Sequence, residues 1–165
     1  MDIPTPIPAQ PTRFLDKVRA FIRLRGMAYK TEKTYLFWIK RFIRFHGLQH
    51  PEVLGSKEVE AFLSHLVLQV NVSASTQRVA LNALVFLYRE FLGQPLDDLN
   101  FEHSRKPVKL PTVFSAEEAR SVIRNLSGDY KLVAMLLYGS GLRINEALRL
   151  RVKDVDFDMQ QLIVR

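Results

Sequence analysis

The 165-residue sequence predicts a mainly α-helical chain built in two parts. Three observations lead to this prediction. Apolar residues recur at helical spacing in four successive stretches before Gly93. A segment with three prolines and no sustained periodicity follows, and the alternation typical of strands occurs only near the C-terminal end. We therefore expect a four-helix domain followed by the helical start of a second, α+β domain.

The predicted domain boundaries follow changes in composition. Prolines at positions 4, 6, 8 and 11 favour an extended leader over residues 1–12. Residues 13–94 contain the four helical stretches. Residues 95–112 mix prolines with charges of both signs, which is typical of a linker. Residues 113–165 begin a second domain.

The four helices of the first domain are predicted from apolar residues spaced three and four apart. Ser56 and Ser75 are the predicted N-caps of the third and fourth helices. Trp38 belongs to the inward stripe of the second helix, so we expect it in the core. The fourth helix is apolar almost all round, which predicts a central position in the bundle. The predicted helices cover approximately residues 13–25, 31–46, 56–70 and 75–92.

The second domain is predicted to begin with a capped helix at Ser115, because Glu118 stands at the third helical position of a capping box. An apolar helix, YKLVAMLLY, follows, and another helix begins at Arg143. After a turn around residues 154–158, the alternation in QLIVR predicts a strand. We predict no partner strand for it. Because a lone strand is not a stable end to a domain, we expect this to be the front part of something larger.

The charge of the chain is concentrated in its first helices. The net charge is +7, and residues 13–44 alone hold 10 basic against 2 acidic residues. A basic surface in one part of a chain favours a polyanion, most often nucleic acid, as binding partner. The alternative is a solvated basic face that only favours solubility.

Composition excludes several classes of site. The absence of cysteine excludes disulfides and thiolate metal sites, and it fits a reducing compartment. The four histidines have no metal-ligand spacing and no nucleophile beside them, so we assign them no role. No run approaches the ~18 apolar residues of a membrane span. The N-terminus also lacks the basic and apolar regions of a secretory signal.

The second predicted helix carries a basic stripe with one aromatic residue. At about 100° per residue, its members fall within a sector roughly 60° wide, opposite the apolar face. Such a stripe fits the wall of a DNA groove, where cations contact phosphates and the ring contacts sugar or a thymine methyl group. A solvated face with one stray phenylalanine is the alternative. The stripe consists of Lys33, Phe37, Lys40 and Arg44. Arg41 of the same helix is also predicted to contact DNA, and further cations lie nearby at Arg13, Lys17, Arg19, Arg23 and Arg25.

Two further groups of residues are predicted to contact DNA. Gln77 and Arg78 lie at the start of the fourth helix, where they could reach base edges or backbone and where free N–H groups favour a phosphate. Arg105, Lys106 and Lys109 make the end of the linker basic.

The stretch YGSGLRINEALRL places an arginine where a helix begins. A guanidinium donates bidentate hydrogen bonds to phosphate oxygens. Gly139 and Gly141 allow a tight turn and close approach of a phosphodiester. Glu146 lies three residues after Arg143 on the same helix face and could hold the guanidinium. The alternative is a surface ion pair between Arg143 and Glu146 without further function.

The stretch LLYGSGLRINEALRLRVKDVDF closely resembles the first catalytic box of the tyrosine recombinases, the phage-integrase-like enzymes. KTEKTYLFWIKRFIRFHG and SASTQRVALNALVFLYREFL resemble their helical core-binding domain, and RKPVKLPTVFSAEEA resembles their linker and the start of the catalytic domain. The most specific similarity is to an integron integrase, and it lies in the segments KTEKTY, FHGLQHP, KEVEAFL and LNALVFLYREF.

The resemblance implies an N-terminal four-helix SAM-like core-binding domain and the helical start of an α+β tyrosine-recombinase catalytic domain. It implies DNA strand exchange through a 3′-phosphotyrosyl intermediate without metal or cofactor, in a tetrameric synaptic complex on duplex DNA. Arg143 matches the arginine that stabilises the scissile phosphate in the transition state, and Glu146 matches the acidic residue that supports it. The implied location is the bacterial nucleoid, in the cytoplasm.

The sequence also departs from the family pattern. No His-x-x-Arg motif occurs, the hairpin lysine would fall just beyond Arg165, and no tyrosine lies after the first box. Because covalent catalysis needs its nucleophile, we expect a truncated chain that binds duplex DNA at recombination sites but cannot cleave it, and that is monomeric in solution. The alternatives are a DNA-binding regulator and a non-functional remnant or helical protein-interaction domain.

Overall fold

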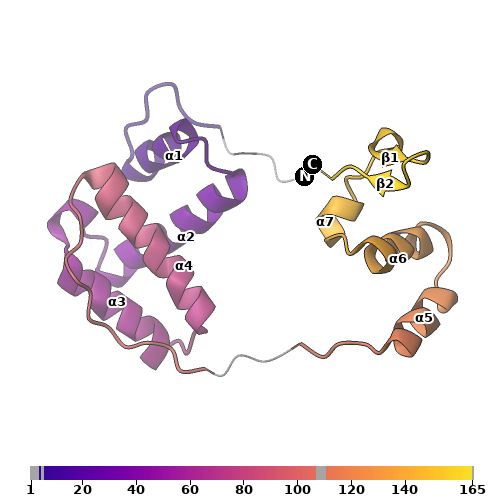
Figure 1. Ribbon diagram of the computed structural model, residues 1–165. Coiled ribbons are helices and arrows are strands. Elements are labelled where there is room, and N and C mark those ends of the chain that lie inside the picture. Colours follow the sequence, from indigo (N-terminus) through magenta and orange to yellow (C-terminus); the bar gives the residue numbers. More distant parts are fainter. Residues whose placement is uncertain (1–3, 5, 107–110, 165) are drawn as a thin grey trace. The chain divides into compact units, whose positions relative to one another are not determined.

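The computed structural model describes residues 4, 6–106 and 111–164, and the chain divides between Val108 and Lys109 into two compact units (Figure 1). Helices build both units, and β1 and β2, the strands found in the described ranges, have two residues each, so the mainly α-helical class is confirmed. Residues 6–12 form neither helix nor strand. The described helices include none that is long and apolar enough to cross a membrane.

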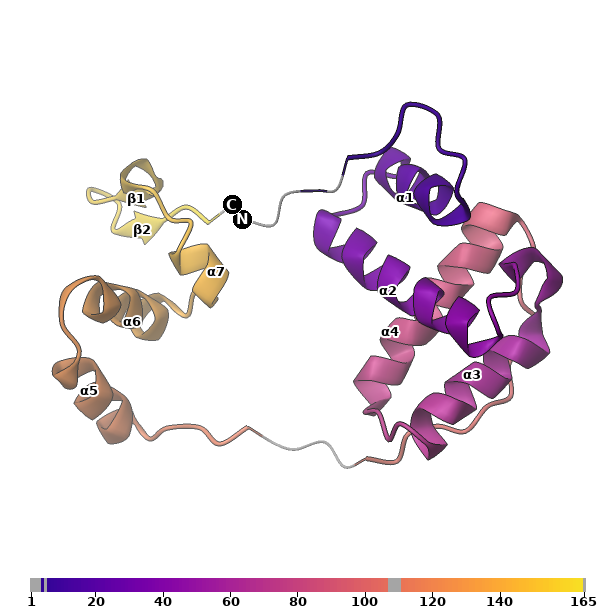
Figure 2. The same ribbon diagram turned by 180° about the vertical axis from the view of Figure 1, so that it is seen from behind.

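The first unit contains the four predicted helices, with α2 packed across α4 (Figures 1 and 2). The fourth helix continues beyond α4 as a π-helical segment, η2, and ends at Gly93, whose positive φ of 67° suits glycine. The elements are α1 (Phe14–Leu24), α2 (Tyr29–Phe45), the 3-10 turn η1 (Pro51–Val53), α3 (Ser56–Leu68), α4 (Ala74–Val85) and η2 (Phe86–Leu92).

The core of the first unit draws on all of these helices. Trp38 is buried in it, as predicted. Tyr88 is buried as well, and its hydroxyl donates a hydrogen bond to the Pro51 carbonyl oxygen at 3.0 Å. Burial raises the pKa of this phenol. The other fully buried large side chains are those of Val18, Ile22, Ile39, Phe42, Pro51, Val59, Phe62, Leu63, Leu66, Leu84 and Leu87.

The fourth helix is capped by a different serine from the one predicted. Ser73, not Ser75, is the N-cap of α4, and its Oγ accepts the Thr76 amide hydrogen at 3.2 Å. Ser75 lies inside the first turn, and its Oγ is 2.9 Å from that of Ser73. The prediction missed this position because two serines two residues apart offer the same local signal.

The third helix is also capped differently from the prediction. Gly55 is the N-cap of α3, and the Glu58 carboxylate accepts the Gly55 amide hydrogen at 2.7 Å. Ser56 is the first residue of the helix. Its Oγ accepts a hydrogen bond from the amide of Asp97, which is 41 residues away in sequence. A serine can thus be diverted from capping by a tertiary contact that local sequence does not reveal.

The segment after η2 is not a free linker along its whole length. Residues 96–106, which we call the strap, run back along α3 within the first unit (Figures 1 and 2). Leu96, Leu99 and Phe101 of the strap pack against the core. The interval predicted as a linker, 95–112, therefore begins with a segment bound to the first unit.

The second unit begins with the capped helix predicted at Ser115. Ser115 Oγ accepts the Glu118 amide hydrogen at 3.2 Å, and the Glu118 carboxylate accepts the Ser115 amide hydrogen at 2.8 Å, so the capping box is confirmed. The elements of the unit are α5 (Ala116–Asn125), α6 (Gly128–Ser140), α7 (Ile144–Ala147), the 3-10 turn η3 (Val152–Asp154), β1 (Val155–Asp156) and β2 (Gln161–Leu162).

The strand predicted near the end of the chain does have a partner, so its prediction as unpaired was wrong. β1 and β2 form an antiparallel pair in which Val155 lies opposite Leu162. The turn between them is closed by the Asp156 carboxylate, which accepts the Met159 amide hydrogen at 2.8 Å. A local bond from a side chain to the backbone stabilises the turn that joins the two short strands.

The second unit exposes much of its apolar surface. Of its described residues, 111–164, those that are buried are Ala147 and Asp154. A unit with so small a buried core gains little stability from apolar burial. Its exposed large apolar side chains include Val113, Phe114, Leu132, Met135, Ile144, Leu148, Val152, Phe157, Met159, Ile163 and Val164.

Candidate nucleic-acid interface and phosphate site

The predicted stripe of the second helix is exposed along α2. Phe37 keeps 54% of its surface exposed, although large aromatic side chains are usually buried. Its ring packs edge-on against Trp38, with the centroids 5.1 Å apart. The guanidinium of Arg41 lies over Trp38, 5.5 Å from the ring centroid. The exposed apolar ring is therefore held in place by the core tryptophan behind it.

Three members of the stripe, Phe37, Lys40 and Arg44, line one shallow surface hollow of about 490 Å³ together with Arg41. Lys33, one helical turn before Phe37, is exposed on the same helix. This arrangement surrounds an apolar ring with cations. It can contact phosphate oxygens and an apolar sugar or base surface at the same time.

The arginines of the first helix contribute less to this surface than the sequence predicted, because carboxylates neutralise them. Glu32 at the start of α2 is only 2% exposed. Its carboxylate accepts two hydrogen bonds from Arg23, at 2.7 and 3.0 Å, and this bidentate pair joins α1 to α2. Two further ion pairs, both at 2.8 Å, are Arg19–Asp16 and Arg25–Glu90.

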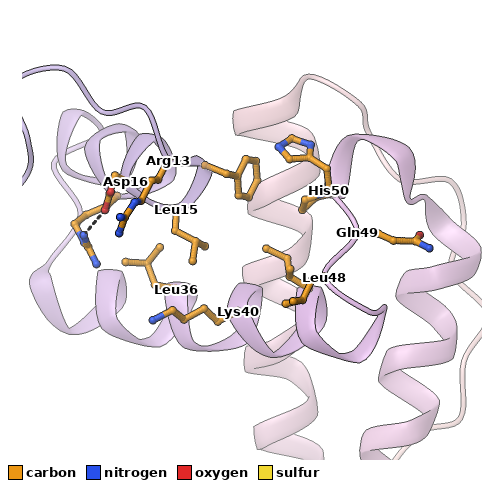
Figure 3. A pocket seen from close by; sticks show the side chains of 12 residues that line it. Arg13, Leu15, Asp16, Leu36, Lys40, Leu48, Gln49 and His50 are labelled. Carbon is orange, nitrogen blue, oxygen red and sulfur yellow. Dashed lines mark hydrogen bonds and ion pairs between the residues drawn. The ribbon is translucent and has the colours of Figure 1, made fainter.

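A cavity of about 460 Å³ lies beside the stripe, between the start of α1, α2 and the loop before η1 (Figure 3). Leu15, Leu36 and Leu48 form apolar walls, and the Lys40 amino group reaches its edge. Its polar groups come from exposed side chains such as Gln49 and from the half-buried ion pair of Arg19 with Asp16. It is a hollow in the surface next to the stripe, and Lys40 borders both.

Gln77 does not lie on a surface that DNA could reach, which corrects the sequence prediction. Its side chain is 4% exposed. Its Nε2 donates to the carbonyl oxygens of Leu63, at 3.3 Å, and Glu102, at 2.6 Å. Its Oε1 accepts the Ser104 amide hydrogen at 3.1 Å. The first turn of α4 is covered by the strap, and residue spacing within one helix cannot reveal that cover.

Arg78, the neighbour of Gln77, is exposed beside the end of the strap. It lines a cavity of about 180 Å³ together with Phe101, His103 and Ser104. Arg105 and Lys106 are exposed at the end of the strap, and the Lys106 amino group donates to the Asn71 carbonyl oxygen. A second group of cations thus gathers near the N-terminus of α4. Lys109, the remaining predicted contact, lies outside the described residues.

In the second unit, Arg143 is the N-cap of α7 rather than the first residue of a buried helix. Its side chain is 87% exposed. The Nη1 group donates to Glu146 Oε1 at 2.9 Å, and the Arg143 amide donates to Glu146 Oε2 at 2.7 Å. One carboxylate therefore caps the short helix and holds the guanidinium at once.

The backbone conformation before Arg143 explains why a glycine stands at position 141 but not why one stands at position 139. Gly141 ends α6 with a φ of 64°, a conformation that favours glycine. Gly139 lies inside α6, and a Cβ there would meet nothing within 4 Å. The hydrogen bond from the Arg143 amide, followed by that from its side chain, lowers the pKa of the Glu146 carboxyl. The carboxylate is therefore charged at neutral pH beside an exposed guanidinium.

The histidine and tyrosine side chains considered next are not arranged as a metal site or a catalytic site. The described residues hold no group of three or more His, Asp or Glu side chains placed to bind a metal ion. His46 lies 3.0 Å from the Glu58 carbonyl oxygen and stacks edge-on against Phe42. Tyr88 is buried in the first unit, so its hydroxyl is not placed to attack a phosphodiester.

Comparison with protein-family models gives two matches that together cover most of the chain. The model for the phage integrase N-terminal SAM-like domain matches residues 14–98, more than half of the chain, and the model for the phage integrase family matches residues 112–165. The chain belongs to the phage integrase family. The predictions of a SAM-like helical domain and of the start of a tyrosine-recombinase catalytic domain are thereby confirmed.

Curated phage integrase relatives are similar along nearly the whole chain. Proteins named integrase/recombinase from Escherichia coli and Pseudomonas aeruginosa are each 45% identical over 159 residues, which is 96% of this chain and 47% of theirs. Tyrosine recombinase XerA from Thermococcus kodakarensis is 26% identical over 160 residues, 95% of this chain and 54% of that protein. The chain spans about half the length of the curated relatives it matches.

Among solved structures, a crystal structure of XerA recombinase is 22% identical in sequence, with a TM-score of 0.46. The match covers 88% of this chain and 51% of that one.

Proposed function

We propose that this phage integrase family member binds duplex DNA through the first unit and belongs to a site-specific recombination system. The observation that carries the proposal is the exposed stripe on α2, where Phe37 stands among Lys33, Lys40, Arg41 and Arg44. Arg19, Arg23 and Arg25 nearby are paired with carboxylates. Lys33, Lys40 and Arg44 of the stripe are exposed, and Arg41 is half-buried over Trp38. Arg78, Arg105, Lys106 and Lys109 are proposed as further DNA contacts.

We further propose catalytic roles for two residues of the second unit. Arg143 would donate hydrogen bonds to the scissile phosphate and stabilise the charge of the transition state. Glu146 would act as a positioning residue through the guanidinium. The contact between the two side chains supports this division, because Glu146 engages one of the five N–H donors of the guanidinium at 2.9 Å.

We also propose that the protein is similar to an integron integrase. It would act at recombination sites in a tetrameric synaptic complex, in the bacterial nucleoid. The 165-residue chain is proposed to be monomeric in solution and to bind DNA without cleaving it. Its five tyrosines, at positions 29, 35, 88, 130 and 138, all lie before Arg143 in the sequence. The domains proposed for these roles are 13–94 and 113–165.

The experiment that tests DNA binding is titration of a labelled duplex with the chain at rising salt. The affinity is expected to fall steeply, with about 0.9 unit of log–log slope for each phosphate contact. Arg143→Ala should leave most of this affinity intact, because the second unit carries little net charge. No binding to duplex DNA at low salt would refute the proposal.

Footprinting distinguishes a recombination protein from a DNA-binding regulator. We expect protection on duplexes that carry recombination sites and weaker, non-specific binding to promoter fragments. Preferential protection of promoters would favour the regulator instead.

A further inference from the structure

The strap is fastened to α3 by a regular set of hydrogen bonds. Three α3 side chains spaced four residues apart lie on one face of the helix and accept strap amide hydrogens. Each helical turn of α3 thus holds one point of the strap. The pairs are Ser56 with Asp97 at 3.1 Å, Glu60 with Asn100 at 2.7 Å, and Ser64 with Glu102 at 3.1 Å.

Gln77 closes this attachment from the side of α4. Its buried carboxamide binds Leu63 of α3, and both Glu102 and Ser104 of the strap, through the three hydrogen bonds described above. Both the donor nitrogen and the acceptor oxygen are engaged with the strap, so the side chain fixes the path of the strap's backbone. Ser104 Oγ adds a hydrogen bond to the Val72 carbonyl oxygen at 2.8 Å.

These contacts decide where the next two residues lie. Ser104 is held from two sides, and Arg105 and Lys106 follow it as the last two residues of the strap. Lys106 donates to the Asn71 carbonyl oxygen in the turn between α3 and α4. Arg78 borders the same part of the strap. Cations held on a folded surface lose less conformational entropy on binding a phosphate than cations on a free linker.

We propose that Gln77 is a positioning residue that latches the strap and thereby makes Arg105 and Lys106 part of the DNA-binding surface of the first unit. The inference rests on the proposed DNA binding and adds a residue that does not itself contact DNA. In this account Gln77 acts only through the strap, and the strap acts through its two terminal cations.

The test is a double-mutant cycle read out by duplex affinity. Gln77→Leu removes the latch with little change in volume, and Arg105→Ala/Lys106→Ala removes the cations. We expect Gln77→Leu to weaken binding about tenfold in the wild-type background and less than about twofold in the Arg105→Ala/Lys106→Ala background. An equal loss in both backgrounds would show a purely structural role and overturn the proposal.

Asn100→Pro provides a second variant that leaves α4 unchanged. It removes the amide that Glu60 accepts, so it should loosen the strap and reproduce the pattern of Gln77→Leu, including when the latter folds poorly. Undiminished affinity of a folded Asn100→Pro chain would contradict the account.

Hydrogen exchange separates the latch from DNA binding. In the wild-type chain the strap amides at positions 100, 102 and 104 should exchange at least about tenfold more slowly than in a free peptide, and Gln77→Leu should abolish this protection. Unprotected amides in the wild type would refute the latch. If the amides are protected but Arg105→Ala/Lys106→Ala leaves affinity unchanged, the role in DNA binding is wrong, whereas a wild-type chain that binds no duplex refutes the proposed function itself.

Discussion

Arg143 and Glu146 are joined by two hydrogen bonds, one from the Arg143 amide at 2.7 Å and one from its guanidinium at 2.9 Å. The first bond caps α7, and the second fixes the direction of an otherwise exposed side chain. A backbone cap and a side-chain support therefore share one carboxylate. The ion pair between Arg143 and Glu146 that the sequence suggested is therefore present, and it involves the same guanidinium that we propose as the phosphate ligand.

The two hydrogen bonds from Arg143 should lower the pKa of Glu146 by different amounts. The backbone amide of Arg143 is the larger cause of the lowered pKa, so Arg143→Ala should raise it only part of the way toward the ordinary value of about 4.3. Because a lowered pKa favours the charged form in the fold, both hydrogen bonds should persist above that ordinary value and be lost as pH falls through the folded pKa.

Carboxyl-carbon NMR titration of the chain measures this pKa. Glu118 serves as the internal control, because its pKa is lowered by Ser115 and should not respond to Arg143→Ala. A Glu146 that titrates in its ordinary range in the wild type would contradict the observed cap.

Tyr88→Phe should destabilise the first unit. The substitution removes the hydroxyl that satisfies the buried Pro51 carbonyl oxygen, which predicts a loss of about 1–2 kcal/mol in the free energy of unfolding. Fluorescence of Trp38, the single tryptophan and a core residue of this unit, reports the denaturant midpoint. Tyr130→Phe, at an exposed position of the second unit, is the control and should leave the midpoint unchanged. Equal midpoints for Tyr88→Phe and wild type would disprove the effect.

Phe37→Ala should separate apolar from electrostatic contributions to DNA binding. Loss of the ring should raise the dissociation constant roughly tenfold, because an apolar contact to sugar or a thymine methyl group disappears. The slope of affinity against salt should stay the same, because no charge is removed. Titrations of one duplex at several salt concentrations measure both quantities. A changed slope with unchanged low-salt affinity is the outcome that this account excludes.

The sequence predicted the features that depend on local periodicity. The apolar spacing of the first four helices and the position of Trp38 follow from 3.6-residue periodicity, and the Ser115–Glu118 box from capping chemistry. The exposure of the α2 stripe followed from the same spacing, since it lies opposite the apolar face.

Features that depend on distant partners were missed. Gln77 and Ser56 looked like residues of helix starts, but their partners lie in the strap, 25 to 41 residues away. The pairing of Arg25 with Glu90 spans 65 residues. The spacing of Ser56, Glu60 and Ser64 was the available signal, because polar side chains four residues apart mark one face of a helix. Only the fold shows that this face binds the strap.

The most direct test of the central claim compares two double variants with equal loss of charge. Lys40→Ala/Arg44→Ala removes two cations of the α2 stripe, and Lys57→Ala/Arg89→Ala removes two exposed cations elsewhere in the first unit. The dissociation constant for one duplex is measured across a range of salt concentrations. We predict that the stripe variant loses about two units of log–log slope while the control keeps the wild-type slope. Equal slopes in the two variants would contradict a DNA-binding surface on α2.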